Sequence, residues 1–324
     1  MNSQPLARLV QAFLVMLAMT VIVFIGIHLI GNPVDILISP EADQMERDRM
    51  MSTFGMDKPL WTQYGIFLMN ALQGDLGTSF VYNLPAIDVV LSRLPATLEL
   101  ALVALLLAVV IGIPLGLYCG LRPDSPVSRF IMAFSILGFS LPGFWMGLIL
   151  IMVFAVELGW LPSTGRGDTV EFLGVQWSFL TWNGLSHMLL PAINLAMFKL
   201  SMVLRLTRAG VTETLSTDYI KFARARGLSP QRIVGVHVLK NIMIPLVTII
   251  GMEFGSTVAF AIVTETVFAW PGIGKLIIDS INVLDRPVIV AYLMIVVSLF
   301  VLLNFLVDLT YYALDPRARR GGRA

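Results

Sequence analysis

The stretch DYIKFARARGLSPQRIVGVHVLKN, residues 218–241, is a basic segment with clear turn punctuation inside a very apolar chain. Seven Lys or Arg and only two acids, Glu213 and Asp218, occur between Arg205 and Lys240, whereas the whole chain is 57% hydrophobic and 13% charged. Soluble chains carry about 25% charged residues. The rest of this chain therefore lacks the charge that a water-exposed surface needs, and lipid must be its main solvent.

The turn residues in this stretch predict two helices joined by a sharp elbow. The Ser-Thr-Asp run at 216–218 offers three residues that can cap a helix over 219–226. Gly227 suits the left-handed position that follows a helix C-terminus. Ser229 is a good N-cap for a second helix, and Pro230 suits the first turn of that helix.

Small and basic residues are interleaved on the first of these helices. Ala223 and Gly227 are four residues apart, so we expect them to share a face with almost no side chain, ringed by Lys221, Arg224 and Arg226. Such a face is shaped for a docking partner. The charge alone has a simpler explanation, because cytoplasmic loops of membrane proteins are rich in Lys and Arg, but that explanation leaves the small face and the elbow unaccounted for.

Six segments are long and apolar enough to cross a bilayer, which takes about 20 residues. Their apolar runs are continuous rather than alternating, which favours helices over barrel strands. We therefore predict an all-α integral membrane protein with a single transmembrane domain over residues 1–324. The first segment is too long for a signal-peptide core and lacks a cleavage site, so we expect it to be retained. The predicted spans are residues 8–30, 97–120, 130–157, 187–209, 242–268 and 288–313.

The placement of Lys and Arg orients these spans. With the N-terminus inside, 14 of the 22 basic residues face the cytoplasm, seven face the other side, and Lys199 lies within a span. An excess of Lys and Arg marks the cytoplasmic side. Both termini and the loop 210–241 are therefore predicted to be cytoplasmic, and the segment 31–96 extracytoplasmic.

Two of the predicted spans contain glycine and proline. GIPLG, residues 112–116, is a small-xxx-small pattern that lets helices approach closely, although its glycines could equally ease a kink at Pro114. FSLPGFW places Pro142 and Gly143 inside the third span and predicts a kink or an unwound turn. Such a break fits either the border of a transport pathway or ordinary kinked packing.

The chain shows no pattern for ATP hydrolysis, metal binding or nucleophilic catalysis, so we predict that it is not an enzyme. PGIGKLII contains Gly-Lys, but a phosphate-binding loop would need glycine at Ala269 and Ser or Thr at Leu276. The three histidines are far apart, and Cys119 is the single cysteine. The basic loop has few aromatic residues for stacking and lies next to two spans, so nucleic acid is not an expected partner.

The opening stretch, extended to DYIKFARARGLSPQRIVGVHVLKNIMIP, resembles the cytoplasmic loop of permease subunits in ABC importers of the dipeptide/oligopeptide class, which also includes opine and nickel systems. Further segments resemble the family, and its B-type dipeptide subunits, in the family's order. The general permease motif begins Glu-Ala-Ala and has glycine four residues after the second alanine. Here Lys221, Phe222 and Ala223 take those places, Gly227 matches, and the Glu is absent. The further segments are FGMDKPLWTQYGIFLMNALQGDLGTSF, LPATLELALVALLLAVVIGIPLG, SLPGFWMGLILI, GWLPSTGRG, HMLLPAINLA and TETVFAWPGIGKLIIDSI.

This resemblance implies the type I ABC-importer permease fold, with residues 218–232 forming a coupling helix and elbow that dock into a cleft of an ATPase subunit. It also implies a bacterial inner-membrane location and import of di- or oligopeptides, or a related small solute, by alternating access. The implied partners are a second homologous permease in a heterodimer, two ATP-binding subunits that use ATP and Mg, and an extracytoplasmic solute-binding protein, while this chain binds no cofactor. The implied coupling residues are Tyr219, Lys221, Ala223, Arg224, Ala225, Arg226, Gly227, Leu228 and Ser229.

Acids at membrane depth are candidates for the substrate pathway. A charge at the bilayer centre costs about 2.5–3.5 kcal/mol, so each acid should face protein or water. Glu265 resembles a family position near the extracytoplasmic gate, and Glu253 lies twelve residues before it on a similar helix face. Either carboxylate could interact with a peptide amino terminus, or could instead pair with Lys199 or bond between helices. The candidate pathway residues are Glu253, Ser256, Thr257, Phe260 and Glu265.

Two other classes of function compete with the importer. An ion- or proton-coupled secondary transporter would use the intramembrane carboxylates, and it predicts inverted repeats with paired broken helices, which this sequence does not show. A structural or signalling membrane protein would leave the elbow unexplained. Dependence on a partner ATPase separates the importer from both.

Overall fold

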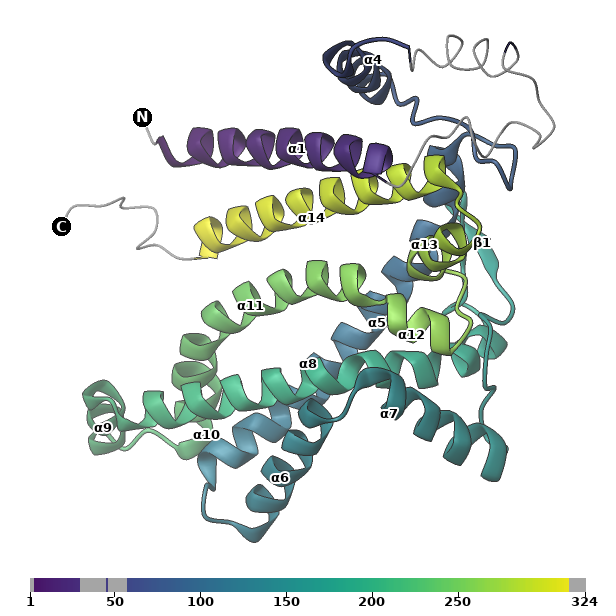
Figure 1. Ribbon diagram of the computed structural model, residues 1–324. Helices are drawn as coiled ribbons and strands as arrows, with labels where there is room; N and C mark the ends of the chain where they lie inside the picture. Colours follow the sequence, from purple (N-terminus) through teal and green to yellow (C-terminus); the bar gives the residue numbers. More distant parts are fainter. Residues whose placement is uncertain (1–2, 30–44, 46–56, 315–324) are drawn as a thin grey trace. The chain divides into compact units, whose positions relative to one another are not determined.

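The computed structural model describes residues 3–29, 45 and 57–314, and it is mostly helical (Figure 1). Two of the helical segments, η1 and η2, are π-helices. In chain order the elements are α1 (Ser3–Leu29), α4 (Leu60–Leu72), α5 (Ala86–Leu121), α6 (Pro126–Ser140), α7 (Gly143–Leu150), η1 (Ile151–Glu157), β1 (Val170–Phe172), β2 (Val175–Trp177), α8 (Trp182–Ser216), α9 (Asp218–Ala225), α10 (Pro230–Arg232), η2 (Ile233–Val238), α11 (Leu239–Phe260), α12 (Ile262–Val267), α13 (Ile273–Asn282) and α14 (Arg286–Leu314).

The chain forms two compact units, of which the first comprises Met1–Leu94 and Leu276–Val301. In this unit α4 packs on α1. The Thr20 and Tyr64 hydroxyls are 2.8 Å apart, and the Phe24 and Tyr64 rings meet edge to face with centroids 5.3 Å apart. The apolar helix α4 therefore has a packing partner within its own unit.

The second unit comprises Pro95–Lys275 and Leu302–Ala324, and α8 is its longest helix. Contacts of α8 with α6, α7 and α11 bury the apolar clusters of this unit. At 1.5 Å per residue, 35 residues make a helix about 50 Å long, which exceeds the hydrocarbon core of about 30 Å. The helix is therefore longer than a direct crossing of the bilayer requires, and Figure 1 shows α9 at its C-terminal end.

Glycines on α5 allow close packing against α8, which decides between the two interpretations of GIPLG. α5 continues through Pro114 without interruption. A Cβ added at Gly116 would lie 2.6 Å from the Thr207 Cβ, and one added at Gly120 would lie 2.6 Å from the Val211 Cβ. The two helices thus approach so closely that only glycine fits.

Three described helices pass as membrane spans by length and hydropathy: Ala86–Leu121, Trp182–Ser216 and Arg286–Val307. Two bent helix pairs bring the number to five if each pair is one span. The part of α1 that counts as a shorter apolar helix is Val10–Gly26. The spans predicted at 97–120, 187–209 and 288–313 lie on the three long helices, while six spans in all remain a prediction.

The two bent pairs fall on the third and fifth predicted spans. The helices 126–138 and 143–157 are bent by 108° at Pro142 and Gly143, which confirms a break where the sequence indicated one. In the fifth segment, α11 ends at Phe260 and α12 begins at Ile262, so the predicted range 242–268 holds two helices. A second bend lies near the start of this range, where the helices 230–243 and 245–260 meet at 46°.

One element departs from the all-α prediction. β1 and β2 form an antiparallel hairpin with Val170 opposite Trp177 and Phe172 opposite Val175. Leu173 and Gly174 turn between them with φ of +56° and +75°, the positive values that a tight two-residue hairpin loop needs. Several predictions lie outside the described residues: the cytoplasmic location of the two chain ends, residues 31–44 and 46–56 of the extracytoplasmic segment 31–96, and the charges Arg47, Arg49, Arg317, Arg319, Arg320 and Arg323.

Candidate functional site

The elbow after α9 is built from local hydrogen bonds that only glycine accommodates. Gly227 has a φ of +77°, and its N–H donates to the Arg224 carbonyl at 2.9 Å. The Leu228 N–H donates to the Ala223 carbonyl at 3.2 Å, so the two bonds together form a Schellman motif. Ser229 then caps the next helix by accepting from the Arg232 N–H at 3.4 Å. The predicted elbow, with its left-handed glycine and its Ser-Pro helix start, is confirmed.

One face of α9 is buried against its own chain. Ile220 is fully buried and Ala223 is 6% exposed, and both belong to an apolar cluster that includes Val238 and Ile242. The prediction that Ala223 and Gly227 present one exposed small face is therefore wrong for Ala223. Its methyl group instead lets α9 lie close to the start of α11, while Gly227 is exposed.

The opposite face of α9 is basic and carries two exposed aromatic rings. Phe222 is 64% exposed and Tyr219 is 45% exposed, and the Arg226 guanidinium lies 5.6 Å from the centre of the Phe222 ring. Lys221 pairs with Asp218 at 2.8 Å in full contact with solvent. Of the predicted coupling residues, Tyr219, Lys221, Arg224, Ala225, Arg226, Gly227 and Ser229 are exposed, and Leu228 is half-buried.

Sequence reasoning did not include Phe222 among the candidate coupling residues. The signal for it was present, because a large aromatic residue with charged neighbours on both sides of a short hydrophilic helix is expected to find a partner. With Arg226 stacked on it, Phe222 is a natural anchor for a docking contact.

The elbow is tied to both long helices of its unit. The Asn241 side-chain amide donates to the Thr214 hydroxyl at 3.1 Å, which joins α11 to α8. A Cβ added at Gly210 would lie 2.9 Å from the Ile242 side chain, so the two helices are in close contact there. The two helices are therefore held together beside the elbow.

A pocket of about 580 Å³ lies where α6 breaks into α7, and α8, α11 and α12 complete its wall. Three predicted pathway residues, Glu253, Ser256 and Phe260, line it. Lys199 on α8 pairs with the Glu253 carboxylate and donates to the Ser256 hydroxyl at 2.9 Å. Pairing of Glu253 with Lys199, weighed as the alternative role for this acid, is thus present in the structure, and the pair faces the pocket.

Glu265 and Thr257 lie apart from this pocket. Glu265 is fully buried, where its carboxylate accepts from the Thr97 hydroxyl at 2.5 Å and from the Lys275 N–H at 2.9 Å. A Cβ added at Gly272 would lie 2.3 Å from that carboxylate, so the turn after α12 packs directly against the Glu265 side chain. The Thr257 hydroxyl donates to the Glu253 carbonyl one turn earlier. The structure therefore does not place Glu253 and Glu265 on one pathway-facing side.

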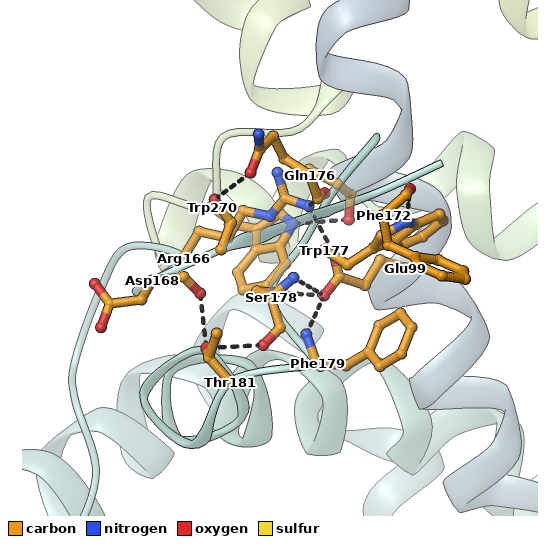
Figure 2. A network of polar contacts seen from close by, with 12 residues as sticks. Glu99, Arg166, Asp168, Phe172, Gln176, Trp177, Ser178, Phe179, Thr181 and Trp270 are labelled. Carbon is orange, nitrogen blue, oxygen red and sulfur yellow. Dashed lines mark hydrogen bonds and ion pairs between the residues drawn. The ribbon is translucent and has the colours of Figure 1, made fainter. Parts of the chain in front are cut away.

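A second buried acid, Glu99, lies within α5 and gathers polar groups from the hairpin and the residues after it (Figure 2). It accepts from Arg166 at 2.6 Å, from the Ser178 N–H at 2.9 Å and from the Phe179 N–H at 2.8 Å, and the Ser178 hydroxyl also donates to it. Arg166 further donates to the Gln176 carbonyl at 2.6 Å. This network fastens the β1–β2 hairpin to α5.

The sequence analysis did not consider Glu99, although an acid at the third position of the apolar run from residue 97 was a visible signal. Arg166 was counted only as an extracytoplasmic charge. A metal site has no support in the described part of the chain, since no three His, Cys, Asp or Glu residues gather there.

Comparison with known proteins adds to this geometry. The family model described as binding-protein-dependent transport system inner membrane component matches residues 112–320. The dipeptide transport system permease protein of Alkalihalophilus pseudofirmus is 34% identical over 98% of this chain and all of its own length. The di/tripeptide transport system permease protein of Pseudomonas aeruginosa is 39% identical over 93% of this chain and 94% of its own length.

Two further comparisons agree with these. The oligopeptide transport system permease protein of Bacillus subtilis is 36% identical over 98% of this chain and 99% of its own length. A chain of the MetNI methionine ABC transporter, solved in inward-facing conformations, superposes with a TM-score of 0.54 over 71% of this chain and 98% of that chain, at 20% identity. The last likeness shows the fold.

Proposed function

This chain belongs to the family of binding-protein-dependent transport system inner membrane components, and we propose that it forms half of the pore of an ATP-driven importer of di- or oligopeptides. It is an inner-membrane transport subunit of the ABC type rather than an ATPase. The observation that carries the proposed substrate class is the identity of 34–39% to peptide permeases over nearly the whole chain. The comparisons give no support to an ion- or proton-coupled secondary transporter.

In the proposed assembly this chain pairs with a second, homologous permease, and two ATP-binding subunits hydrolyse ATP with Mg on the cytoplasmic side. A solute-binding protein delivers peptide from the extracytoplasmic side. Six spans with both termini in the cytoplasm would place α9 and the rest of the 218–232 segment against an ATP-binding subunit. The exposed basic and aromatic face of α9 supports this arrangement, because arginine and aromatic residues are the usual anchors of protein interfaces.

The link from ATP to the pore would run through the elbow. Closing of the ATP-binding subunits would displace α9, and the buried Ile220 and Ala223 would pass that displacement to α8 and α11. These helices also carry the pocket residues Lys199 and Glu253. The substrate pathway would then include Glu253, Ser256 and Phe260. Thr257 and Glu265 would support the same helices through hydrogen bonds within the protein.

Uptake by the complete complex tests this proposal. Proteoliposomes containing both permeases and both ATP-binding subunits, supplied with the binding protein and radiolabelled alanyl-alanine, should accumulate the peptide only when ATP is present on the cytoplasmic side. A pH gradient without ATP should drive none. Accumulation that persists without ATP and follows the pH gradient would overturn the proposal in favour of secondary transport.

A further inference from the structure

The pocket at the α6–α7 break contains opposite charges that are poised to exchange partners. Lys199 and Glu253 line it, with side-chain exposures of 11% and 22%, and the two charges neutralise each other. Ser256 lies between the two charged groups. Its hydroxyl accepts a hydrogen bond from Lys199 and lies 2.9 Å from a carboxylate oxygen of Glu253. Charges held inside a membrane protein are usually paired with each other or face a cavity, and these two are paired and line a pocket.

A buried acceptor in the same wall has no partner. Asn194 is 6% exposed, its amide nitrogen donates to the Thr264 hydroxyl at 3.0 Å, and its Oδ1 forms no hydrogen bond. Buried polar atoms are almost always hydrogen-bonded, so an exception in a pocket wall points to a ligand that supplies the missing donor. A peptide N–H or an ammonium group is such a donor.

The helix break adds a feature that favours negative charge. Gly143 and Phe144, the first residues of α7, line the pocket, and no side chain caps this helix N-terminus. Uncapped N–H groups and the helix dipole together favour an anion there. A broken helix at membrane depth is also tolerated only where it lines a cavity or is buried in protein.

We propose that this pocket binds the two charged ends of a short peptide by opening the Lys199–Glu253 pair. Glu253 takes the peptide ammonium, Lys199 and the start of α7 take the carboxylate, and the Asn194 Oδ1 accepts a peptide N–H. This inference deepens the proposed import function and rests on it. The volume of about 580 Å³ lies within the range of about 300–1,000 Å³ that ligand pockets occupy.

Opening the Lys199–Glu253 pair need not leave either charge without an opposite partner. When a zwitterion enters, each protein charge exchanges one opposite partner for another, so the pocket stays neutral throughout. When the peptide leaves, Lys199 and Glu253 pair again and close the polar path. A peptide with one blocked end leaves one protein charge without its partner and should pass more slowly.

Uptake of end-blocked peptides tests this inference. The probes are alanyl-alanine, N-acetyl-alanyl-alanine and alanyl-alanine amide, each at a concentration that saturates the binding protein, as set by its measured affinity for that probe. Saturation removes capture by the binding protein from the comparison, so that the maximal rates report later steps. We expect wild-type complex to import alanyl-alanine about tenfold or more faster than either blocked peptide, the factor that one charged hydrogen bond provides.

Two double variants separate recognition from structure. Lys199→Met with Glu253→Gln removes both charges together, and Lys199→Glu with Glu253→Lys retains a pair in reversed order. Assembly of each variant is checked by size-exclusion chromatography, and ATP hydrolysis is measured beside uptake. We expect the neutral variant to import all three probes at rates within about twofold of one another. The reversed variant still offers one charge of each sign and should keep a preference for free ends.

Each outcome decides between the two proposals. No ATP-driven uptake of any probe by the wild type would overturn the import function itself. Equal wild-type rates for free and blocked peptides would overturn the pocket proposal while leaving import intact, and this result needs no variant. An unchanged preference in the assembled neutral variant would show that the ion pair only holds α8 and α11 together.

Discussion

Replacing Gly227 by arginine should uncouple uptake from ATP while leaving the permease folded. Gly227 has a φ of +77°, and no atom of the chain lies within 4 Å of the position of an added Cβ, apart from its immediate neighbours. The first atom of a new side chain therefore meets no obstacle among the described residues of this subunit. A side chain in left-handed backbone costs about 1–2 kcal/mol.

That strain is no larger than the packing that holds α9 in place. Burial of Ile220 alone contributes about 1.5–3 kcal/mol, and Ala223 adds to it. The helix should therefore stay on the elbow cluster. An arginine forced into a packed contact with a partner costs a further 1–3 kcal/mol or so, which corresponds to a loss of about tenfold or more.

Gly74 provides a matched control. It follows α4 with a φ of +80°, it too has no atom within 4 Å of an added Cβ, and its N–H donates to the Ala71 carbonyl at 3.1 Å. The Asp75 N–H donates to the Asn70 carbonyl, so the motif is the same as at Gly227. Gly74→Arg thus introduces equal backbone strain in the predicted extracytoplasmic segment, where no ATP-binding subunit reaches.

The assay compares ATP-driven alanyl-alanine uptake by both variants in proteoliposomes, with assembly checked by size-exclusion chromatography. Gly227→Arg should lose about tenfold or more, and Gly74→Arg less than about twofold. Gly227→Asn, whose side chain tolerates left-handed backbone, should retain more activity than Gly227→Arg. Equal losses at 227 and 74 would refute the reasoning, because backbone strain and not contact with a partner would then explain them.

Two further predictions concern the stability of the second unit. Glu99→Gln removes the counter-charge of the half-buried Arg166 and should destabilise the complex by up to about 3 kcal/mol, seen as a lower Tm. Glu171→Gln on the exposed hairpin should change the stability by less than about 0.5 kcal/mol. Similar Tm values for the two variants would contradict a structural role for the network. Gly116→Ala places a methyl group 2.6 Å from Thr207 and should lower the Tm through about 1–3 kcal/mol of overpacking, while Gly65→Ala in α4, with open space around it, should not lower it; no difference between the two would mean that α5 and α8 are less closely packed than described.

Features that depend on local chemistry could be predicted from the sequence. Gly227 and Ser229 adopt the predicted conformations because a left-handed turn and a helix cap are decided by the residues that form them. The break at Pro142 was visible for the same reason. Its angle of 108° was not, because it depends on how α7 packs against α8 and α12.

Features that depend on distant contacts could not be predicted. Ala223 was expected to face a partner, but the buried side of α9 is decided by contacts with Val238 of η2 and Ile242 of α11. Glu99 and Arg166 are 67 residues apart, and no periodicity links them. Glu253 and Glu265 share a face only if one helix continues through both, and the chain begins a new helix after Ala261.

The most direct test of the account is to ask what α9 touches in the assembled complex. Cys119 is the only cysteine and is buried, so Cys119→Ala with Ala225→Cys gives a single exposed thiol on α9. A benzophenone maleimide attached there should, on illumination, cross-link to an ATP-binding subunit. The account is contradicted if the thiol reacts only with reagent added from the extracytoplasmic side, or if the labelled α9 forms no adduct with an ATP-binding subunit in a complex that imports peptide.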